Sequence, residues 1–414
     1  MFSSPFSGKR EIAKQPHEHN RVEKYRRYWL YYAAPEGDPY STHNEIPSLK
    51  DFKDVPEYAS GVFNYVPFVV NVDLNLLLGE DSSQMLSGPD SMATEKLHEF
   101  AEQAEFDRSL YNALFSALVC GDAYVKVVPV EDGAGVRFVS LDAASVFPRL
   151  DPHDHNRVRE VLVDYRYRDE ANRLRRHSEL WMDDEVLVMR DGEKVEELSG
   201  DNPLGTIPIV HFACQPLPGS YFGRPSYIDV LADIDRLNSS AGAMFEVYKY
   251  YGSPKLILRG VMADNVELDP NVRQFWQLPS TDSDVSFLEW RNVTGMMDEL
   301  MKLDFVVRRK LPEFILENVN DTLYPSSGYA VSLQLSLLDS KLRTLSAGFR
   351  RSAAELLELG QVVAGLDPIK AKIRLGAGRE GLIQSLQTVF KLRDEGVITR
   401  SEAREKLREE GVLD

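Results

Sequence analysis

Cysteine is scarce in this sequence, and no long apolar run is present. Cys120 and Cys214 are too few for a disulfide framework or a thiolate zinc site, which indicates a reducing compartment and two small core residues. The longest apolar tract, residues 114–128, is interrupted by Asp122 and Lys126, and the N-terminus lacks the apolar segment of a secretion signal. The sequence therefore predicts a soluble, unprocessed protein without a membrane partner.

Basic residues are outnumbered by acidic ones. The chain has 48 Lys and Arg against 65 Asp and Glu, for a formal net charge of −17. Proteins that grip nucleic acid by displacing counterions have the opposite balance, so tight wrapping of DNA is disfavoured. Residues 1–32 differ, with seven basic and three acidic side chains. Within them the segment YRRYWLYY, residues 25–32, is typical of a protein interface, with base stacking as the alternative.

Motifs of the common enzymes are missing. The sequence has no GxxxxGK[ST] phosphate loop, no HExxH zinc motif and no GxSxG nucleophile elbow. We therefore expect no enzymatic activity, no catalytic residue, no bound metal and no cofactor.

Two acidic clusters could still bind a metal. The cluster Asp151 to His155, in DPHDHN, contains two imidazoles, but a surface turn is the favoured interpretation. The carboxylates of Asp229, Asp233 and Asp235 suggest a magnesium-dependent nuclease, yet Arg236 follows them, and a solvated helix face is favoured.

The composition is that of a folded chain, 43% hydrophobic and 10% aromatic, long enough for two or three domains. Residues 1–20 lack periodicity and are predicted to be a flexible arm. Helical spacing follows at 57–79 and 94–120, and then the period changes to two. The runs predicted as strands are 124–128, 136–140, 158–167, 177–182, 186–190 and 207–212. We therefore expect an α+β fold.

The second half of the chain is mainly helical. A four-three spacing of apolar residues predicts a helix from Pro225 to Gly252, and Thr294 is predicted to cap a second helix that kinks or ends at Pro312. Between them, strands are predicted at 255–259, 274–278 and 285–290. A polar loop, an uninterrupted leucine-patterned helix of about 35 residues, and short helices at 380–394 and 399–410 complete the chain.

Several short sequence segments occur in an order that is typical of one protein family. They are YRRYWLYYAAP, LFSALVCGDAYVKVVP, NPLGTIPIVHFACQP, GRPS and GSP around the first helix of the second half, and SSGYAVSLQLSLL at the start of the long helix. Together with the order of the elements, they resemble the portal proteins of tailed double-stranded DNA bacteriophages. The resemblance implies an α+β portal fold with a mixed α/β wing, a two-helix stem, a small strand-rich clip, a long wing helix and a short helical crown. Its boundaries would be arm 1–20, wing 21–222, stem helices 223–252 and 293–316, clip 253–292, tunnel loop 317–328, long wing helix 329–365 and crown 366–414.

The resemblance also implies a function. The chain would form a homo-oligomeric ring, usually a dodecamer, at one capsid vertex of the virion, through which DNA is packaged and later ejected. Its partners would be double-stranded DNA without sequence preference, the large terminase motor, a head-tail adaptor, and the major capsid or scaffold protein, with assembly in the host cytoplasm. The acidic charge is consistent with this, because an acidic ring repels phosphate and lets DNA slide.

Three groups of candidate site residues follow. The DNA-facing tunnel loop would contain Asn318, Asn320, Asp321, Thr322 and Tyr324. In the clip, large aromatics beside arginine predict a docking surface for a partner: Arg259, Arg273, Trp276 and Trp290. On the first stem helix, apolar residues without an evident partner nearby predict a seam between subunits: Leu231, Ile234, Ala241 and Phe245.

Two other functions remain open. One is a metal-dependent nuclease or other phosphoryl enzyme built on the Asp229–Asp235 cluster, against which the lack of a nearby His or Lys argues. The other is a different structural protein, such as a head-completion adaptor, although such a protein rarely needs a helix of about 35 residues.

Overall fold

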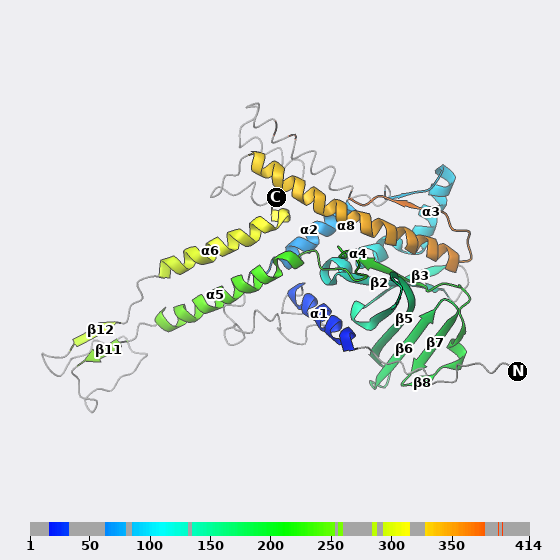
Figure 1. Ribbon diagram of the computed structural model, residues 1–414, viewed down its shortest axis with the longest axis horizontal. Helices are drawn as coiled ribbons and strands as arrows, with labels where there is room; N and C mark the ends of the chain where they lie inside the picture. Colours follow the sequence, from blue (N-terminus) through cyan, green and yellow to red (C-terminus); the bar gives the residue numbers. More distant parts are fainter. Residues whose placement is uncertain are drawn as a thin grey trace. The chain divides into compact units, whose positions relative to one another are not determined.

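A computed structural model describes residues 16–32, 63–79, 85–130, 135–252, 256–259, 284–287, 293–314 and 328–376, with Thr388 and Lys391. The chain divides into two compact units (Figure 1). The larger unit comprises residues 1–46, 64–229 and 311–414, and the helical unit comprises residues 47–63 and 230–310. The described helices and strands confirm the α+β fold class.

The long helices of the larger unit differ in three places from the prediction, the first being that the helix predicted over 57–79 begins only at Val66, after the non-helical residues 63–65. They are α1 (Pro16–Tyr32), α2 (Val66–Leu78), α3 (Ser91–Gln103), α4 (Phe106–Cys120) and α8 (Gly328–Val363). The arm predicted over 1–20 is too long, because α1 starts at Pro16, a residue whose fixed φ suits the first turn of a helix. The single helix predicted over 94–120 is two helices, because Glu105 has a left-handed φ of 50° that ends the helical path.

Two antiparallel sheets form most of the β-structure of the larger unit. The strands are β1 (Leu86–Ser87), β2 (Asp122–Pro129), β3 (Val136–Leu141), β4 (Val146–Asp151), β5 (Asp154–Arg168), β6 (Leu174–Met182), β7 (Glu185–Arg190), β8 (Glu193–Lys194), β9 (Gly200–Asp201), β10 (Ile209–Ala213) and β13 (Lys372–Ile373). A three-stranded sheet has the order β10-β2-β3, and a six-stranded sheet has the order β4-β5-β6-β7-β8, with β9 paired to β7. The period-two pattern predicted β2, β3, β5, β6, β7 and β10 but missed the six-residue β4 and the two-residue strands β1, β8, β9 and β13.

The core of the larger unit lies around the three-stranded sheet. Both α4 and α8 contact its strands, and α2 packs on α4 and α8. Strand β2 is buried on both faces from Asp122 to Val125, as expected for a strand covered by helices. Residues 366–376, predicted to begin the crown, are bound into this unit, because β13 pairs with β1 and Arg374 N donates to the Met85 carbonyl.

The helical unit contains two long helices and a two-stranded sheet. Helix α5 spans Leu231–Gly252, α6 spans Val293–Lys310, and β11 (Leu256–Arg259) pairs antiparallel with β12 (Asp284–Phe287). The short turns η4 (Ala143–Ser145), η5 (Glu196–Leu198), η6 (Ile228–Val230) and η8 (Pro312–Phe314) complete the described elements.

Two predicted helix starts in this half of the chain are corrected. Helix α5 begins at Leu231 and not at Pro225, because the carbonyl of Pro225 accepts from Ile228 N in a turn. Thr294 lies inside α6 and is not its cap. The predicted end at Pro312 is confirmed, since α6 ends at Lys310 and the turn η8 begins at Pro312. No helix in the described ranges is long and apolar enough to cross a membrane.

Candidate functional site

Helices α5 and α6 are held together within the helical unit. Lys310 Nζ of α6 donates to Asp233 Oδ2 of α5 at 2.6 Å. Asn238 of α5 is buried and bonds the backbone of Phe63 in both directions, accepting from its N–H and donating to its carbonyl at 3.0 Å each. One face of α5 is therefore occupied within the single chain.

The subunit seam predicted on α5 is corrected by this packing. Leu231, Ile234 and Ala241 are all buried within the chain, and the side chain of Phe245 lies outside the described residues. The prediction failed because a four-three spacing shows that a helix has an apolar face but not which element covers it. These three side chains cannot form an exposed surface for a second subunit.

An exposed apolar stripe lies on α6 instead. Met297, Met301 and Phe305, spaced four apart, are 45%, 52% and 36% exposed. Residues four apart share one face of a helix, so the three side chains form a continuous row. An adjacent side of α6 carries the buried Leu300 and Val307. The four-residue spacing is visible in the sequence. Nothing in the neighbouring residues, however, shows that Met301 and Phe305 are exposed while Leu300 and Val307 are buried.

Most of the other candidate residues lie outside the described ranges. This holds for the whole tunnel-loop group, Asn318 to Tyr324, and for Arg273, Trp276 and Trp290 of the clip. Arg259 is the last residue of β11 and is paired in register with Asp284 of β12. These assignments stay predictions.

The acidic clusters do not form a metal centre in the described chain. Asp233 is paired with Lys310, and the exposed Asp229 lies 3.9 Å from Arg224. Asp151 accepts from the His153 backbone N–H at 2.8 Å in the tight turn between β4 and β5, as the surface-turn interpretation predicted. Within the described residues, no three His, Cys, Asp or Glu side chains are placed to share a metal ion.

The Tyr/Arg segment 25–32 is divided between the core and the surface. Tyr25 and Tyr31 are buried, whereas Arg26 is exposed, so only the arginine side of the segment stays open to the predicted interface role. Asp122 Oδ2 accepts from the Tyr25 hydroxyl at 2.6 Å, while its Oδ1 accepts from His211 Nε2 at 2.7 Å and from Gly223 N at 2.8 Å. Burial, with the Asp122 carboxylate beside it, raises the pKa of Tyr25 above its ordinary range, so the hydroxyl remains a donor. This network ties α1 to β2 and β10.

A second buried network joins α2, η8 and α8. Lys341 Nζ lies 2.8 Å from Asp73 Oδ2 and also pairs with Glu313 Oε1. The pKa of Asp73 is raised to about 7, mainly by burial, with Glu313 adding to the rise and Lys341 opposing it. Burial lowers the pKa of Lys341, but the two carboxylates outweigh it, so the pKa lies above its ordinary value. Two carboxylates around one ammonium favour retention of one proton.

The match to a family model agrees with the resemblance seen in the sequence. The model of the family described as "Phage portal protein, SPP1 Gp6-like" matches residues 9–360. A solved structure titled "Virion of native gene transfer agent (GTA) particle" is similar at 14% identity and a TM-score of 0.43, covering 94% of this chain and 99% of that one. No curated protein matches. Since the family model covers most of the chain, this protein belongs to the family of phage portal proteins of the SPP1 Gp6-like type.

Proposed function

We propose that this portal protein assembles into a closed ring, a dodecamer in the expected form, at one vertex of a phage capsid in the virion. Double-stranded DNA would pass through the ring into the head during packaging and out of it at ejection. The observation that carries the proposal, beside membership of the family, is the α6 stripe of Met297, Met301 and Phe305.

The α6 stripe supports a contact between subunits. Apolar side chains in a continuous exposed row are costly in water, and such rows mark surfaces that become buried against another protein. In a ring, each subunit contacts the next through two different surfaces. We therefore place one of these surfaces on α6, which replaces the rejected seam on α5.

The charge of the chain supports passage of DNA without tight binding. A ring of chains that each carry a formal charge of −17 repels phosphate. We propose that loop 317–328 faces the DNA and presents Asn318, Asn320, Asp321, Thr322 and Tyr324, so that contact is brief and independent of base sequence.

We propose that the clip, 253–292, binds the large terminase motor during packaging and the head-tail adaptor afterwards. Arg259, Arg273, Trp276 and Trp290 would form the docking surface, because exposed aromatics and arginines dominate the energy of protein interfaces. The major capsid or scaffold protein would surround the ring during assembly in the host cytoplasm. The family is structural and not enzymatic, and the pairing of Asp233 with Lys310 disfavours a nuclease centre.

Negative-stain imaging and light scattering of the purified full-length chain test the ring. We expect particles with a central hole and a mass many times 46.9 kDa. A monodisperse monomer or dimer at low and moderate salt would contradict the proposal.

A further inference from the structure

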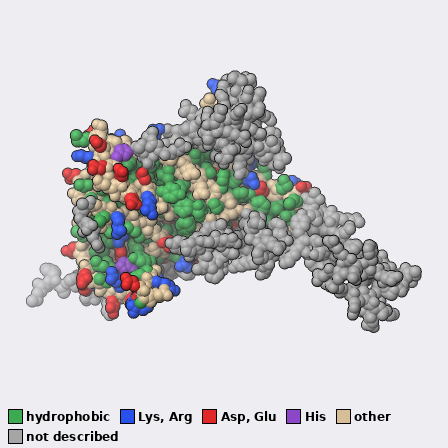
Figure 2. Space-filling model, turned by 180° about the vertical axis from the view of Figure 1, so that it is seen from behind, with side chains coloured by type: hydrophobic (Ala, Val, Ile, Leu, Met, Phe, Trp, Pro, Cys, Tyr) green, Lys and Arg blue, Asp and Glu red, His purple; other side chains and the backbone are tan. Residues whose placement is uncertain are grey.

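Basic and acidic side chains are concentrated on different strands of the six-stranded sheet in the larger unit. Residues 157–176, which form most of β5 and the start of β6, carry seven basic and four acidic side chains. Residues 183–201, which form β7, β8, η5 and β9, carry two basic and eight acidic side chains. Figure 2 shows blue and red side chains crowded over the part of this unit that carries the sheet.

A pocket of about 650 Å³ lies where α1 and η4 meet β5 and β6. Three arginines line it, Arg26, Arg166 and Arg176, together with the carboxylates of Asp142 and Asp164. Asp164 accepts from Arg176 at 2.8 Å and 3.2 Å, so this arginine is neutralised. Arg26 and Arg166 are exposed, and neither pairs with an acidic side chain in the described part of the chain. Three arginines against two carboxylates leave the lining with an excess of one positive charge, carried by Arg26 and Arg166, for an acidic partner.

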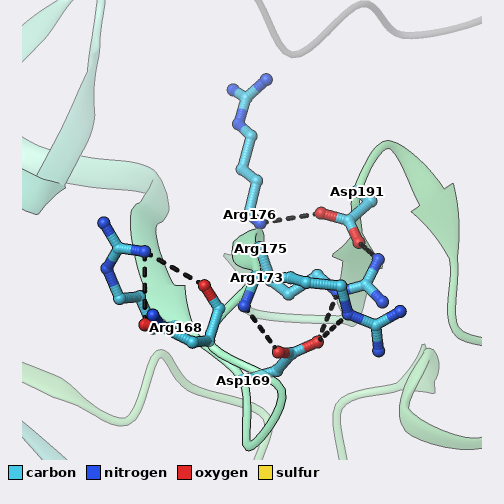
Figure 3. A network of polar contacts seen from close by, with 7 residues as sticks. Arg168, Asp169, Arg173, Arg175, Arg176 and Asp191 are labelled. Carbon is cyan, nitrogen blue, oxygen red and sulfur yellow. Dashed lines mark hydrogen bonds and ion pairs between the residues drawn. The ribbon is translucent and has the colours of Figure 1, made fainter.

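The arginines at the nearby tip of the β5–β6 hairpin are already paired. Figure 3 shows Asp169 beside Arg173 and Arg175, at 3.0 Å and 3.1 Å, and Asp191 beside Arg175 at 2.8 Å. The guanidinium of Arg176 points away from this network (Figure 3). The ion pairs of Arg173 and Arg175 therefore lie at the hairpin tip, whereas Arg26 and Arg166 at the pocket have no such pair within the described chain.

The β8 edge of the same sheet carries exposed negative charge. Glu193 of β8 and Glu197 of η5 are exposed and pair with no basic side chain among the described residues, whereas Glu196 is paired with Lys194 at 2.8 Å. Leu198, next to Glu197, is 50% exposed. This edge, Glu193 to Leu198, presents two free carboxylates beside one apolar side chain.

In the strand order β4-β5-β6-β7-β8, the pocket lies beside β5 and β6 and the acidic edge lies at β8. The two surfaces therefore occupy different parts of one sheet, as a head-to-tail contact between two different surfaces requires. We infer that, in the proposed ring, the acidic edge Glu193 to Leu198 of one subunit docks in the arginine pocket of the next copy of this chain.

The fit rests on two kinds of contact. The pocket is lined by Val22 and Tyr165 as well as by arginines, so Leu198 of the neighbouring copy finds apolar partners there. Its Glu193 and Glu197 reach Arg26 and Arg166, and pairing charges that were unpaired in the free subunit fixes the register of the contact. This inference rests on the proposed ring, to which it adds a second contact beside the α6 stripe.

Charge reversal with rescue tests the contact in the full-length chain. R26E/R166E changes the pocket, E193R/E197R changes the acidic edge, and the four-fold variant restores opposite charges with the signs exchanged. We expect each double variant to raise the chain concentration needed for half-assembly about tenfold or more, and the four-fold variant to recover most of this loss. The matched control is R108E, since the Arg108 side chain on α4 is 78% exposed and lies on neither surface. Light scattering and ring counts in negative stain give the readout.

The outcomes separate the inference from the proposed function. If the unmodified chain forms no ring, the proposed function fails first. If it forms rings and both double variants form them equally well, the ring stands and this contact is wrong. Loss of rings on changing the pocket without rescue by the edge would assign the pocket to a different acidic partner, such as another protein or DNA, and would also overturn the inference.

Discussion

Lys341 of the long helix α8 lies 2.8 Å from Asp73 of α2; the Asp73 side chain is fully buried and the Lys341 side chain is 13% exposed. Glu313, in the turn η8 between α6 and α8, completes the group from the other side of the lysine. The three residues come from distant parts of the chain, so this contact fixes where the chain re-enters the larger unit after the helical unit. Breaking a buried ion pair by removing one partner is costly, because a buried charge is left alone.

The raised pKa of Asp73 predicts a pH-dependent stability. A carboxyl whose pKa is raised on folding stabilises the folded state below its unfolded pKa, and this contribution is lost as pH rises through the folded value. With a change from 3.8 to about 7, the free energy of unfolding should fall between about pH 4 and pH 7, by at most about 4 kcal/mol. D73N should flatten this slope in urea unfolding followed by fluorescence, whereas D151N at the surface should not. Equal slopes in the wild type and D73N would show that the carboxyl titrates normally.

Removal of Lys341 should destabilise the larger unit. K341M keeps the apolar stem but leaves Asp73 and Glu313 without a cation, at a cost of about 3–5 kcal/mol in the free energy of unfolding. The exposed Lys370 provides the control K370M, which should be neutral. A midpoint of unfolding for K341M that matches that of K370M would mean that the buried group contributes little.

Gly223 should tolerate no side chain. A Cβ there would lie 2.1 Å from the Gly121 carbonyl oxygen and 2.6 Å from the backbone N and O of Cys214. These are backbone atoms held by hydrogen bonds from Cys214 N to Gly121 O and from Arg224 N to Cys214 O, so they cannot move aside. G223A should therefore lose at least about 3 kcal/mol or fail to accumulate as folded protein. The matched control is G200A, where a Cβ meets nothing within 4 Å; equal thermal stability of the two would contradict the packing.

The α6 stripe predicts an assembly defect without loss of folding. M301D places a charge in the centre of the exposed row, and we expect rings to dissociate while circular dichroism stays unchanged. K302D, on a neighbouring exposed position of α6, makes a larger change in charge and should still form rings. Rings of normal size in M301D would move the subunit contact off this helix.

The proposed tunnel loop predicts a salt-dependent packaging defect. D321K would replace a repeated negative charge around the channel with a positive one, which attracts phosphate and should slow DNA movement at low salt. The defect should ease as salt screens the attraction. Packaging of a DNA of fixed length into empty shells measures it, with ring formation as the control. Wild-type rates for D321K at low salt would mean that this loop does not face the DNA.

Local patterns in the sequence determined much of the secondary structure and the family. Alternation of apolar and polar residues marks β5, β6 and β7, and the leucine spacing marks α8, whose 36 residues match the length expected. These features follow from neighbours along the chain, because period and turn chemistry are local. The order of the elements and phrases led to the portal family, which the family model then confirmed over residues 9–360.

Only the tertiary structure decided which faces are free. The apolar spacing of α5 and of α6 looks alike in sequence, yet Ile234 is buried and Met301 is exposed, because burial depends on what packs across from each helix. The aromatic and arginine residues at 25–32 suggested a surface, but Asp122, far along the chain, draws Tyr25 into the core. Asp73, Glu313 and Lys341 are likewise brought together by the fold and not by their spacing in the sequence. A buried charge is stable only beside its partner, and a partner distant in sequence is brought there by the fold and not by local spacing.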